Sequence, residues 1–454
     1  MTIRFAKAPR RGGPTLRILA LLAAVAAALI GARAAAQTGG YAVNPARTCG
    51  GYPRLPIGMA DGMCAGLVYA RPHGRPSDSI VSFPRTVLPL ANGDMLIVAM
   101  GAWRPGIGSV WRMTLRPGRP PVLRRLLRGL NMPHMAAVGP DGRIYLGEMN
   151  RIARFDPDAP APQATLETVI GDLPSNRLHE YRHPLSAFLF DGDGSLLLNV
   201  GAPSDQCAAP PPARGARCAE GTGTSAAAAI WRYPYLGNGR WSPRRVLLAS
   251  GLRNSMALAR HPSGTILQGE NSIDLPLPES PFDEVNQILP GRFYGWPYCM
   301  DIATPAPAWR AAGAMDCAGP RHTGPAMLLA PHSAPLSMLY YSGSMFPRLR
   351  GRLLVSLHGY RGVGARIMAY DVDARGLPVI RPQATYELFR GGTVVRHPFP
   401  ARGQTGFDLT PNWNAVPGVR PFGRPVGLGV AADGAIWVAD DRNGTIIRIA
   451  ADRP

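Results

Sequence analysis

Apolar and polar residues alternate in short runs along this chain, and the runs recur as one repeated unit. Each unit has a small or apolar run, a turn that contains glycine, and a second apolar run that ends in small or polar residues. Asp-Gly or Asn-Gly between two apolar runs predicts a tight β-hairpin, because glycine and asparagine tolerate the positive φ that such a turn requires. Six units occur, with turn glycines at Gly93, Gly142, Gly194, Gly264, Gly351 and Gly434.

Several predicted hairpins are followed by a third apolar segment that carries an aromatic or basic residue, as at 110–113 and 230–233. Three or four short strands per unit, repeated around a ring, are typical of propeller blades. Pro-, Gly- and Ala-rich insertions lengthen the later units at 200–225, 271–300, 300–335 and 390–425. The pattern predicts an all-β, six-bladed β-propeller with long inter-blade loops. A pair of β-sandwiches is the alternative.

The N-terminal residues predict export. Basic residues precede an uncharged apolar run over 18–31, and small residues follow at 32–36, which is the pattern of a secretory signal peptide. A run of roughly 14 residues is shorter than the ~20 that a spanning helix requires, so cleavage is favoured over an anchor. We predict a signal peptide over 1–36, an N-terminal extension over 37–78 and the propeller over 79–454. The mature protein should be periplasmic or secreted, without a membrane span.

Cysteine usage agrees with an oxidising compartment. The six cysteines fall into three close pairs along the chain, and none has the Cys-x-x-Cys spacing of a metal or haem site. Short-range disulfides are therefore expected rather than metal ligation. The expected pairs are Cys49 with Cys64, Cys207 with Cys218, and Cys299 with Cys317.

The charge excludes several classes of function. The formal net charge is +20, and loss of the six positive side chains of residues 1–36 leaves +14. The remaining arginines are scattered, without the basic stripe or reading helix of a nucleic-acid binder, so no nucleic-acid partner is expected. Lys7 is the only lysine. The mature chain therefore lacks the amine for Schiff-base chemistry and for a Walker-type phosphate site.

Candidate chemistry lies where the chain enters or leaves a predicted hairpin, because the ends of inner strands face a propeller's central channel. His183 precedes the third hairpin and His358 follows the fifth. Around the fourth hairpin, Arg253 and Asn254 enter, and the segment 270–272 leaves, followed by acidic residues at 283–284. Oxygen-bearing side chains on irregular segments suit a hard cation such as Ca²⁺. A lone histidine is more often structural than catalytic.

An ordered set of motifs extends this picture: Arg253-Asn254, Asp283-Glu284-x-Asn286, Tyr294-Gly295-Trp296-Pro297 and Arg424-Pro425-x-Gly427. Over about residues 80–450 the chain resembles the soluble sugar dehydrogenases that depend on pyrroloquinoline quinone (PQQ), and the sorbosone dehydrogenase-like branch in particular. The resemblance implies that His183 is the general base that takes the proton from the sugar's C1 hydroxyl, which suits an imidazole. Many relatives have an acidic residue before this base, whereas Arg182 would lower its pKa.

The resemblance also implies the cofactor contacts. Arg253 and Asn254 would hold the carboxylate and carbonyl oxygens of PQQ, and Arg424 would stabilise charge on the reduced quinone. His358 lies where some relatives place a lysine near the quinone. A catalytic Ca²⁺ would bind near Asn271, Ser272 and Ile273.

A second, structural Ca²⁺ would use Glu284 and the main-chain oxygen of Tyr294. The implied function is oxidation of an aldose or related sugar aldehyde by hydride transfer to PQQ, with Ca²⁺ as Lewis acid and a separate electron acceptor. A calcium-dependent lactonase-type hydrolase and a non-catalytic extracellular binding propeller remain the alternatives, because a fold does not fix a function.

Overall fold

The structure is a computed structural model, and only part of the chain is described. It describes residues 40–72, 79–116, 119–171, 173, 182–207, 212–221, 223, 226–359, 361–390, 393–411, 413 and 423–452. The predicted signal peptide, 1–36, lies outside these residues. No helix in the described ranges has the length and apolar composition to cross a membrane.

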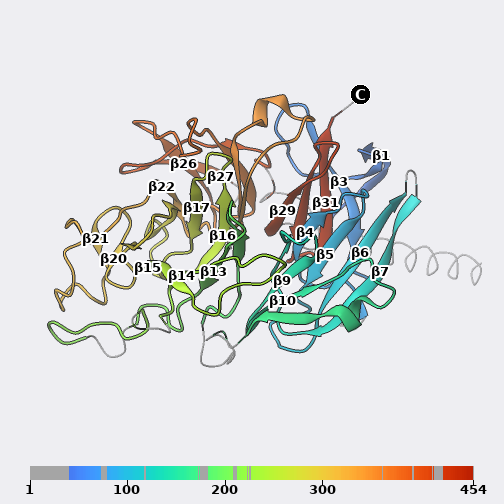
Figure 1. Ribbon diagram of the computed structural model, residues 1–454. Coiled ribbons are helices and arrows are strands. Elements are labelled where there is room, and N and C mark those ends of the chain that lie inside the picture. The colour runs from blue at the N-terminus through green and yellow to red at the C-terminus, as the bar shows by residue number, and fades with distance from the viewer. Residues whose placement is uncertain are drawn as a thin grey trace, which may run out of the picture.

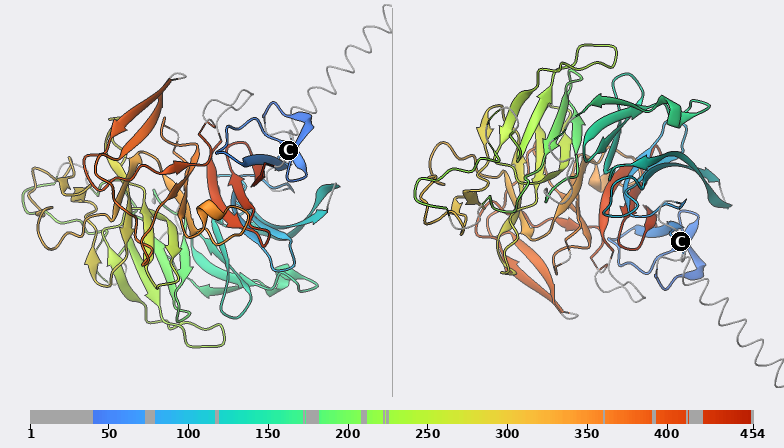
Figure 2. Two further views of the ribbon diagram at one scale, coloured as in Figure 1. Left: turned by 90° about the horizontal axis from the view of Figure 1, so that it is seen from above. Right: turned by 90° about the horizontal axis from the view of Figure 1, so that it is seen from below.

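Six sheets, each with four antiparallel blade strands, form a propeller, and two of these sheets carry additional strands (Figures 1 and 2). The strands of each blade are given from inner to outer, and blade 1 consists of β4 (Pro84–Pro89), β5 (Met95–Ala99), β6 (Gly108–Arg116) and β7 (Arg119–Leu130). Blade 2 consists of β8 (Met135–Val138), β9 (Ile144–Glu148), β10 (Arg151–Phe155) and β11 (Glu167–Ile170). Blade 3 consists of β12 (Phe188–Phe190), β13 (Leu196–Val200), β14 (Ala229–Tyr233) and β15 (Val246–Ser250).

Blade 4 consists of β16 (Ser255–Arg260), β17 (Ile266–Glu270), β18 (Phe282–Gln287) and β22 (Met327–Pro331). Blade 5 consists of β23 (Pro335–Tyr340), β24 (Leu353–Leu357), β25 (Arg366–Tyr370) and β28 (Phe407–Asp408). Blade 6 consists of β29 (Pro425–Val430), β30 (Ile436–Asp440), β31 (Thr445–Ala451) and β3 (Met63–Ala70). Inner strands of successive blades contact one another, for example β29 with β4 and β16 with β23. The all-β, six-bladed propeller predicted from the repeats is confirmed.

The ring is closed by strands from both ends of the chain. β3 pairs antiparallel with β31, so the N-terminal segment supplies the outer strand of the last blade. β1 (Asn44–Cys49) and β2 (Tyr52–Arg54) extend this sheet, and the Cys49–Cys64 disulfide ties β1 to β3. This pairing covers an edge of the last blade that would otherwise present unpaired backbone groups.

The turn glycines adopt the conformation that the sequence predicts. All six have φ between +77° and +95°, a region that a residue with a Cβ enters only at a cost. Five of them connect the inner strand of a blade directly to its second strand. The fifth unit differs, because the inner strand is β23 and a 3-10 helix, η3 (Pro347–Leu349), lies between it and β24. The residues before Gly351 therefore form a connection instead of the predicted inner strand.

The second strands of five blades are buried along their whole length: β5, β9, β13, β24 and β30. Each lies inside a sheet whose two faces pack against neighbouring blades. This explains why the sequence shows continuous apolar runs there rather than strict alternation.

The predicted long loops carry additional small elements. They include β19 (Arg292–Phe293), the hairpin of β20 (Cys299–Met300) and β21 (Thr304–Pro305), and the hairpin of β26 (Thr385–Arg390) and β27 (Thr393–Pro398), while η2 (Pro162–Thr165) precedes β11. Disulfides Cys207–Cys218 and Cys299–Cys317 lie in these loops, so all three predicted pairings are confirmed.

Candidate active site

Polar side chains collect where inner strands begin and second strands end. In an antiparallel hairpin these two points lie at the same edge, so six hairpins around a ring place them at one end of the central channel. Buried or half-buried polar residues there are His134, His183, Arg253, Asn254, Ser333 and Arg424 before inner strands, and Asn271, His358 and Asp441 after second strands. The structure thus brings the sequence-predicted residues of blades 3 to 6 to a common edge.

His183 is fixed in one orientation by the backbone. Its Nδ1 lies 2.7 Å from the carbonyl oxygen of Ala202. Because a carbonyl can only accept, Nδ1 carries the proton in the neutral ring and Nε2 presents a lone pair. No protein group within the described ranges hydrogen-bonds Nε2. Gly201 allows the close approach, since a Cβ there would lie 2.7 Å from the His183 carbonyl oxygen.

The pKa of His183 is lowered to about 3. Burial is the largest cause, followed by the positive charge of Arg253, with Arg182 contributing less in the same direction. The expectation that Arg182 lowers this pKa therefore has the right sign, although Arg182 is exposed and its guanidinium is paired with Asp274 at 2.6 Å. His183 is neutral at physiological pH and available as a proton acceptor.

Arg253 is buried and held from several sides. One terminal nitrogen lies 2.5 Å from Asp205 Oδ1 and 3.3 Å from Asp274 Oδ2, and the other donates to the carbonyl oxygen of Asn271 at 2.9 Å. Trp296 Nε1 donates to the carbonyl of Asp205 at 2.9 Å, which anchors the loop that carries the acid. The Asp205 pKa is lowered, with Arg253 offsetting the effect of burial. Sequence reasoning missed Asp205, because it lies in an insertion without a motif.

Asn254 and Asn271 are brought into contact. The backbone N–H and the side-chain amide of Asn271 both donate to the carbonyl of Asn254 at 3.2 Å. The backbone N–H of Asn254 donates to Glu270 at 3.1 Å, and burial raises the pKa of Glu270 to about 7. The Asn254 Oδ1 is buried without a hydrogen-bond partner in the described structure. A buried amide oxygen in this state is the type of group that a bound cofactor would satisfy.

A second network at the same end joins four blades and was not anticipated. The Asp441 carboxylate, after β30, accepts hydrogen bonds from Arg85 in β4 and from His358 Nε2, the latter at 2.9 Å. Arg85 Nε also donates to His134 Nδ1 at 3.1 Å. Burial, then the charge of Arg85, lowers the pKa of His134 well below its ordinary value. His134 and Asp441 occupy hairpin-entry and hairpin-exit positions, so the rule that selected His183 could also have found them.

Arg424 lies beside this network, immediately before β29. Its backbone N–H donates to Asp440 at 3.0 Å, and its pKa is lowered by burial and by the neighbouring charge of Arg442. Arg85, Arg253 and Arg424 are each less than 7% exposed. Arg85 and Arg253 are paired with Asp441 and Asp205, and all three guanidinium groups lie at one end of the channel, where they could contact an anionic ligand.

The predicted cation ligands lie along blade 4 and the segment that follows β17. Ser272 donates its backbone N–H to Asp283 Oδ1 at 2.8 Å, and the N–H of Ala334 donates to Asp283 Oδ2 at 2.7 Å. Glu284 is opposite Glu270 in the β17–β18 pairing. Burial raises the pKa of Glu284 well above its ordinary value, and the charges of Glu270 and Asp301 add to the effect.

This group of buried carboxylates suits a divalent cation in its donor chemistry. Burial raises the pKa of Asp301 to about 6 with Asp283 adding to the shift. Four acids make up this group: Glu270, Asp283, Glu284 and Asp301. None of them forms an ion pair with a basic side chain within the described ranges. Oxygen donors without a compensating cation are the ligands that Ca²⁺ takes. The side chains do not by themselves complete a site, because no three His, Cys, Asp or Glu among the described residues converge as a metal-binding group.

Tyr294 is buried, and its hydroxyl accepts the N–H of Leu289 at 2.9 Å and donates to the carbonyl of Gln287. Burial raises its pKa to about 12. No hydrogen bond joins Tyr294 to Glu284 in the part of the chain that the structure describes. Glu284 and Tyr294, which are predicted to share a structural Ca²⁺, would therefore be connected through the ion and not through a hydrogen bond to each other.

Comparison with known proteins supports the same family. The fold places the protein in the class of six-bladed propellers. Residues 145–359 match the model of the family "Glucose / Sorbosone dehydrogenase". This range includes the third, fourth and fifth hairpins, with His183, Arg253, Asn254 and His358. The resemblance inferred from the motifs is thereby confirmed, and the matched family is one of sugar-oxidising oxidoreductases. The search of curated proteins gives no match.

Solved structures show the same fold at low identity. The PQQ domain of pyranose dehydrogenase from Coprinopsis cinerea, in its holo form, has a TM-score of 0.64 at 20% identity, covering 89% of this chain and 99% of that one. A calcium structure of a Trichoderma reesei carbohydrate-active enzyme of family AA12 has 0.63 at 19%, covering 90% and 99%. The PQQ-bound aldose sugar dehydrogenase from Streptomyces coelicolor has 0.52 at 16%, covering 87% and 100%.

Proposed function

We propose that this protein is an exported, PQQ-dependent dehydrogenase that oxidises an aldose or a related sugar aldehyde of the glucose or sorbosone type. The observation that carries the proposal is the pairing of a neutral, oriented His183 with a buried arginine, Arg253, inside the segment that matches the sugar dehydrogenase family. The fold shared with PQQ-containing propellers supports it.

In this proposal His183 acts as general base. The Ala202 carbonyl holds Nδ1–H, so Nε2 is the atom that accepts the proton of the sugar hydroxyl as the hydride leaves the same carbon. The low pKa of His183 keeps Nε2 unprotonated in the free protein. PQQ, when bound, supplies the hydride acceptor. The proton therefore leaves through a residue whose orientation is fixed before substrate arrives.

Two guanidinium groups, one amide and one imidazole would hold the cofactor. Arg253 would bind a cofactor carboxylate while Asp205 and the Asn271 carbonyl keep its plane in position. Asn254 Oδ1 would accept a hydrogen bond from a donor group of the cofactor, the partner that it lacks in this structure. Arg424 would stabilise negative charge on the reduced cofactor. His358, held through Nε2 by Asp441, would contact the quinone from blade 5.

Calcium has two proposed places. The main-chain oxygens near Asn271 and Ser272 would bind the ion that polarises the quinone carbonyl. Glu284 and the main-chain oxygen of Tyr294 would bind the second, structural ion, whose charge would offset the cluster of buried carboxylates on blade 4. The three disulfides support a periplasmic or secreted location. A separate acceptor would reoxidise the cofactor.

The direct test is a titration of the apoprotein with PQQ, monitored by absorbance, with and without a calcium chelator. Dye reduction is then scored over a panel of aldoses and sugar aldehydes. We expect saturable binding, calcium dependence and activity with at least one sugar. His183→Asn should bind PQQ as the wild type does and lose turnover, whereas Arg182→Gln, a change at an exposed neighbour, should retain it. Absence of both quinone binding and sugar oxidation would refute the proposal.

A further inference from the structure

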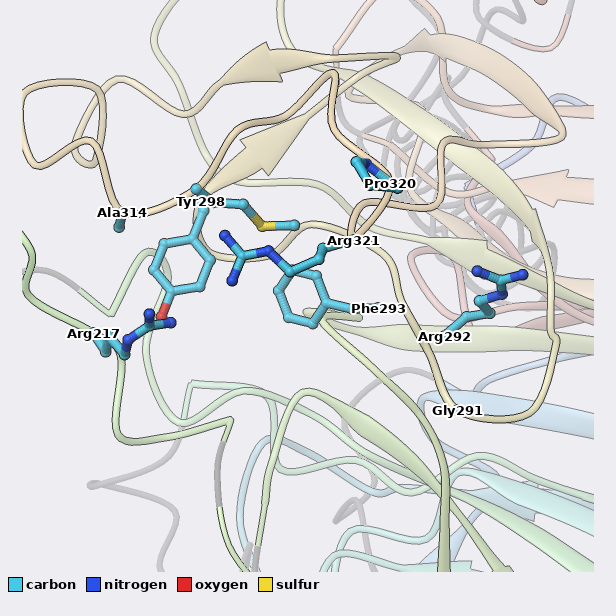
Figure 3. Close-up of a pocket in the computed structure, with 9 residues that line it drawn as sticks. Arg217, Gly291, Arg292, Phe293, Tyr298, Ala314, Pro320 and Arg321 are labelled. Carbon is cyan, nitrogen blue, oxygen red and sulfur yellow. The ribbon is translucent and has the colours of Figure 1, made fainter.

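A cavity of about 370 Å³ opens among the loops beside blades 3 and 4. Its volume lies within the range of small-molecule sites. The residues that give it its character are three arginines, two aromatic residues and one methionine: Arg217, Arg292, Arg321, Phe293, Tyr298 and Met315 (Figure 3). None of these residues belongs to the proposed catalytic site.

The charge of this cavity is not compensated by the protein. Arg217, Arg292 and Arg321 are all exposed, and within the described ranges none of them forms an ion pair with a carboxylate. Some exposed arginines elsewhere are paired, as Arg182 is with Asp274 and Arg390 with Glu279. The local excess of positive charge favours an anionic ligand.

The aromatic residues give the cavity an apolar face. The ring centroids of Phe293 and Tyr298 are 6.1 Å apart, and the rings are inclined by 36°. Arg217 and Arg321 line the same cavity as the two rings, and Figure 3 shows all four side chains. Guanidinium groups and aromatic rings that line one cavity can act together: the guanidinium groups bind a carboxylate or sulfonate, and the rings contact a flat organic body.

The walls of the cavity are fixed by hydrogen bonds and disulfides. The Tyr298 hydroxyl accepts the backbone N–H of Cys218 at 2.8 Å, and the Phe293 carbonyl accepts the N–H of Thr323 at 2.8 Å. Disulfides from Cys218 to Cys207 and from Cys299 to Cys317 hold the adjoining segments. A preorganised cavity binds a small ligand at a lower entropic cost than a mobile loop does.

We propose that this cavity is a binding site for a planar organic anion, such as an aromatic carboxylate or sulfonate. Arg217 and Arg321 bind the anionic group, and Phe293 and Tyr298 contact the flat apolar part. The site is separate from the proposed quinone site, although the two share a loop. The ring of Phe293 packs on Gly251, where a Cβ would lie 2.7 Å from a ring atom, and Arg253 follows two residues later.

The test uses the full mature protein without PQQ, so that its outcome does not depend on the proposed dehydrogenase activity. The probe is 8-anilino-1-naphthalenesulfonate, a planar aromatic anion whose fluorescence rises on binding. Its uncharged analogue, N-phenyl-1-naphthylamine, is the matched probe. We expect saturable binding of the anion, weakened by added salt, and binding of the analogue that is about tenfold weaker, which corresponds to about 1.4 kcal/mol.

The double variant Arg217→Gln/Arg321→Gln should raise the Kd of the anionic probe about tenfold, and leave the affinity of the uncharged analogue unchanged. Arg214→Gln is the matched control, because Arg214 is exposed, lies on the same loop and does not line the cavity. This control should bind both probes as the wild type does. An unchanged Kd in the double variant, or an equal loss in Arg214→Gln, would overturn the proposal. Thermal unfolding of each variant shows whether the fold is retained.

Discussion

Replacement of Asp441 by asparagine removes the negative charge that Arg85 and His358 share. The Arg85 side chain is only 3% exposed, so in the variant its charge would remain buried without a partner. Breaking a buried ion pair from one side typically costs about 3 to 5 kcal/mol, because the remaining charge stays desolvated. With about 2.1 cal/mol/K of unfolding entropy per residue and roughly 400 folded residues, this corresponds to a fall in Tm of about 4 to 6 °C.

Asp433→Asn is the matched control for this experiment. Asp433 makes the same type of contact, with Arg448 at 2.5 Å, but its side chain is 50% exposed. An exposed pair contributes about 1 kcal/mol or less, so the Tm of this variant should change by about 1 °C. Differential scanning calorimetry measures both variants under identical conditions. Arg85→Met combined with Asp441→Leu removes both charges, and should recover at least half of the loss caused by Asp441→Asn.

The pH dependence adds a second test of Asp441. Its pKa is lowered by His358 and Arg85 acting against burial. A carboxyl group with a lowered folded-state pKa contributes stability above its ordinary pKa, and this contribution is lost as the pH falls through the folded-state value. The difference in unfolding free energy between wild type and Asp441→Asn should therefore be full at pH 6 and shrink in strong acid. Equal effects of Asp441→Asn and Asp433→Asn would refute the reasoning, as would a difference that grows in acid.

Further predictions concern the base, the cation and a loop disulfide. His183→Asn should lower kcat/KM by a factor of about 10² to 10⁴ and leave the PQQ affinity unchanged. The folded-state pKa of His183 is about 3, so the wild type should gain stability relative to this variant as the pH rises from about 3 to 6.5. Chemical denaturation at a series of pH values measures this difference. Ca²⁺ should raise the Tm of the wild type, more strongly at pH 8 than at pH 5, because protonated carboxyls bind it poorly. Glu284→Gln should reduce that response, because it removes a ligand of one of the two proposed sites. Loss of the 18-residue Cys299–Cys317 disulfide through C299A/C317A should cost about 3 kcal/mol by loop entropy, and weaken probe binding at the arginine-lined cavity.

The fold could be predicted from the sequence because it depends on local signals that repeat. A tight turn requires positive φ, and Gly93 in the first blade and Gly434 in the last provide it in the same way. The fifth unit was predicted less well, since η3 interrupts the connection and moves the inner strand to Pro335–Tyr340. The pairing of β3 with β31 could not be predicted, because no local pattern specifies which distant strand closes a ring.

The candidate site was only partly predictable for a related reason. His183, Arg253 and Arg424 could be selected because each occupies a fixed position relative to a hairpin. Asp205 was missed because it belongs to an insertion and reaches Arg253 across 48 residues of sequence. Which carboxylate pairs with which guanidinium is decided by the tertiary fold, so sequence spacing does not reveal it.

Arg253 links the two halves of the proposed site. It is the largest electrostatic cause of the low pKa of His183 after burial, and it is also the group assigned to a cofactor carboxylate. An anion bound by Arg253 offsets its positive charge, and an imidazole near a less positive site is a stronger base. Binding of the cofactor would therefore strengthen the base that the reaction uses. Without the cofactor, His183 would remain neutral and weakly basic, oriented by Ala202.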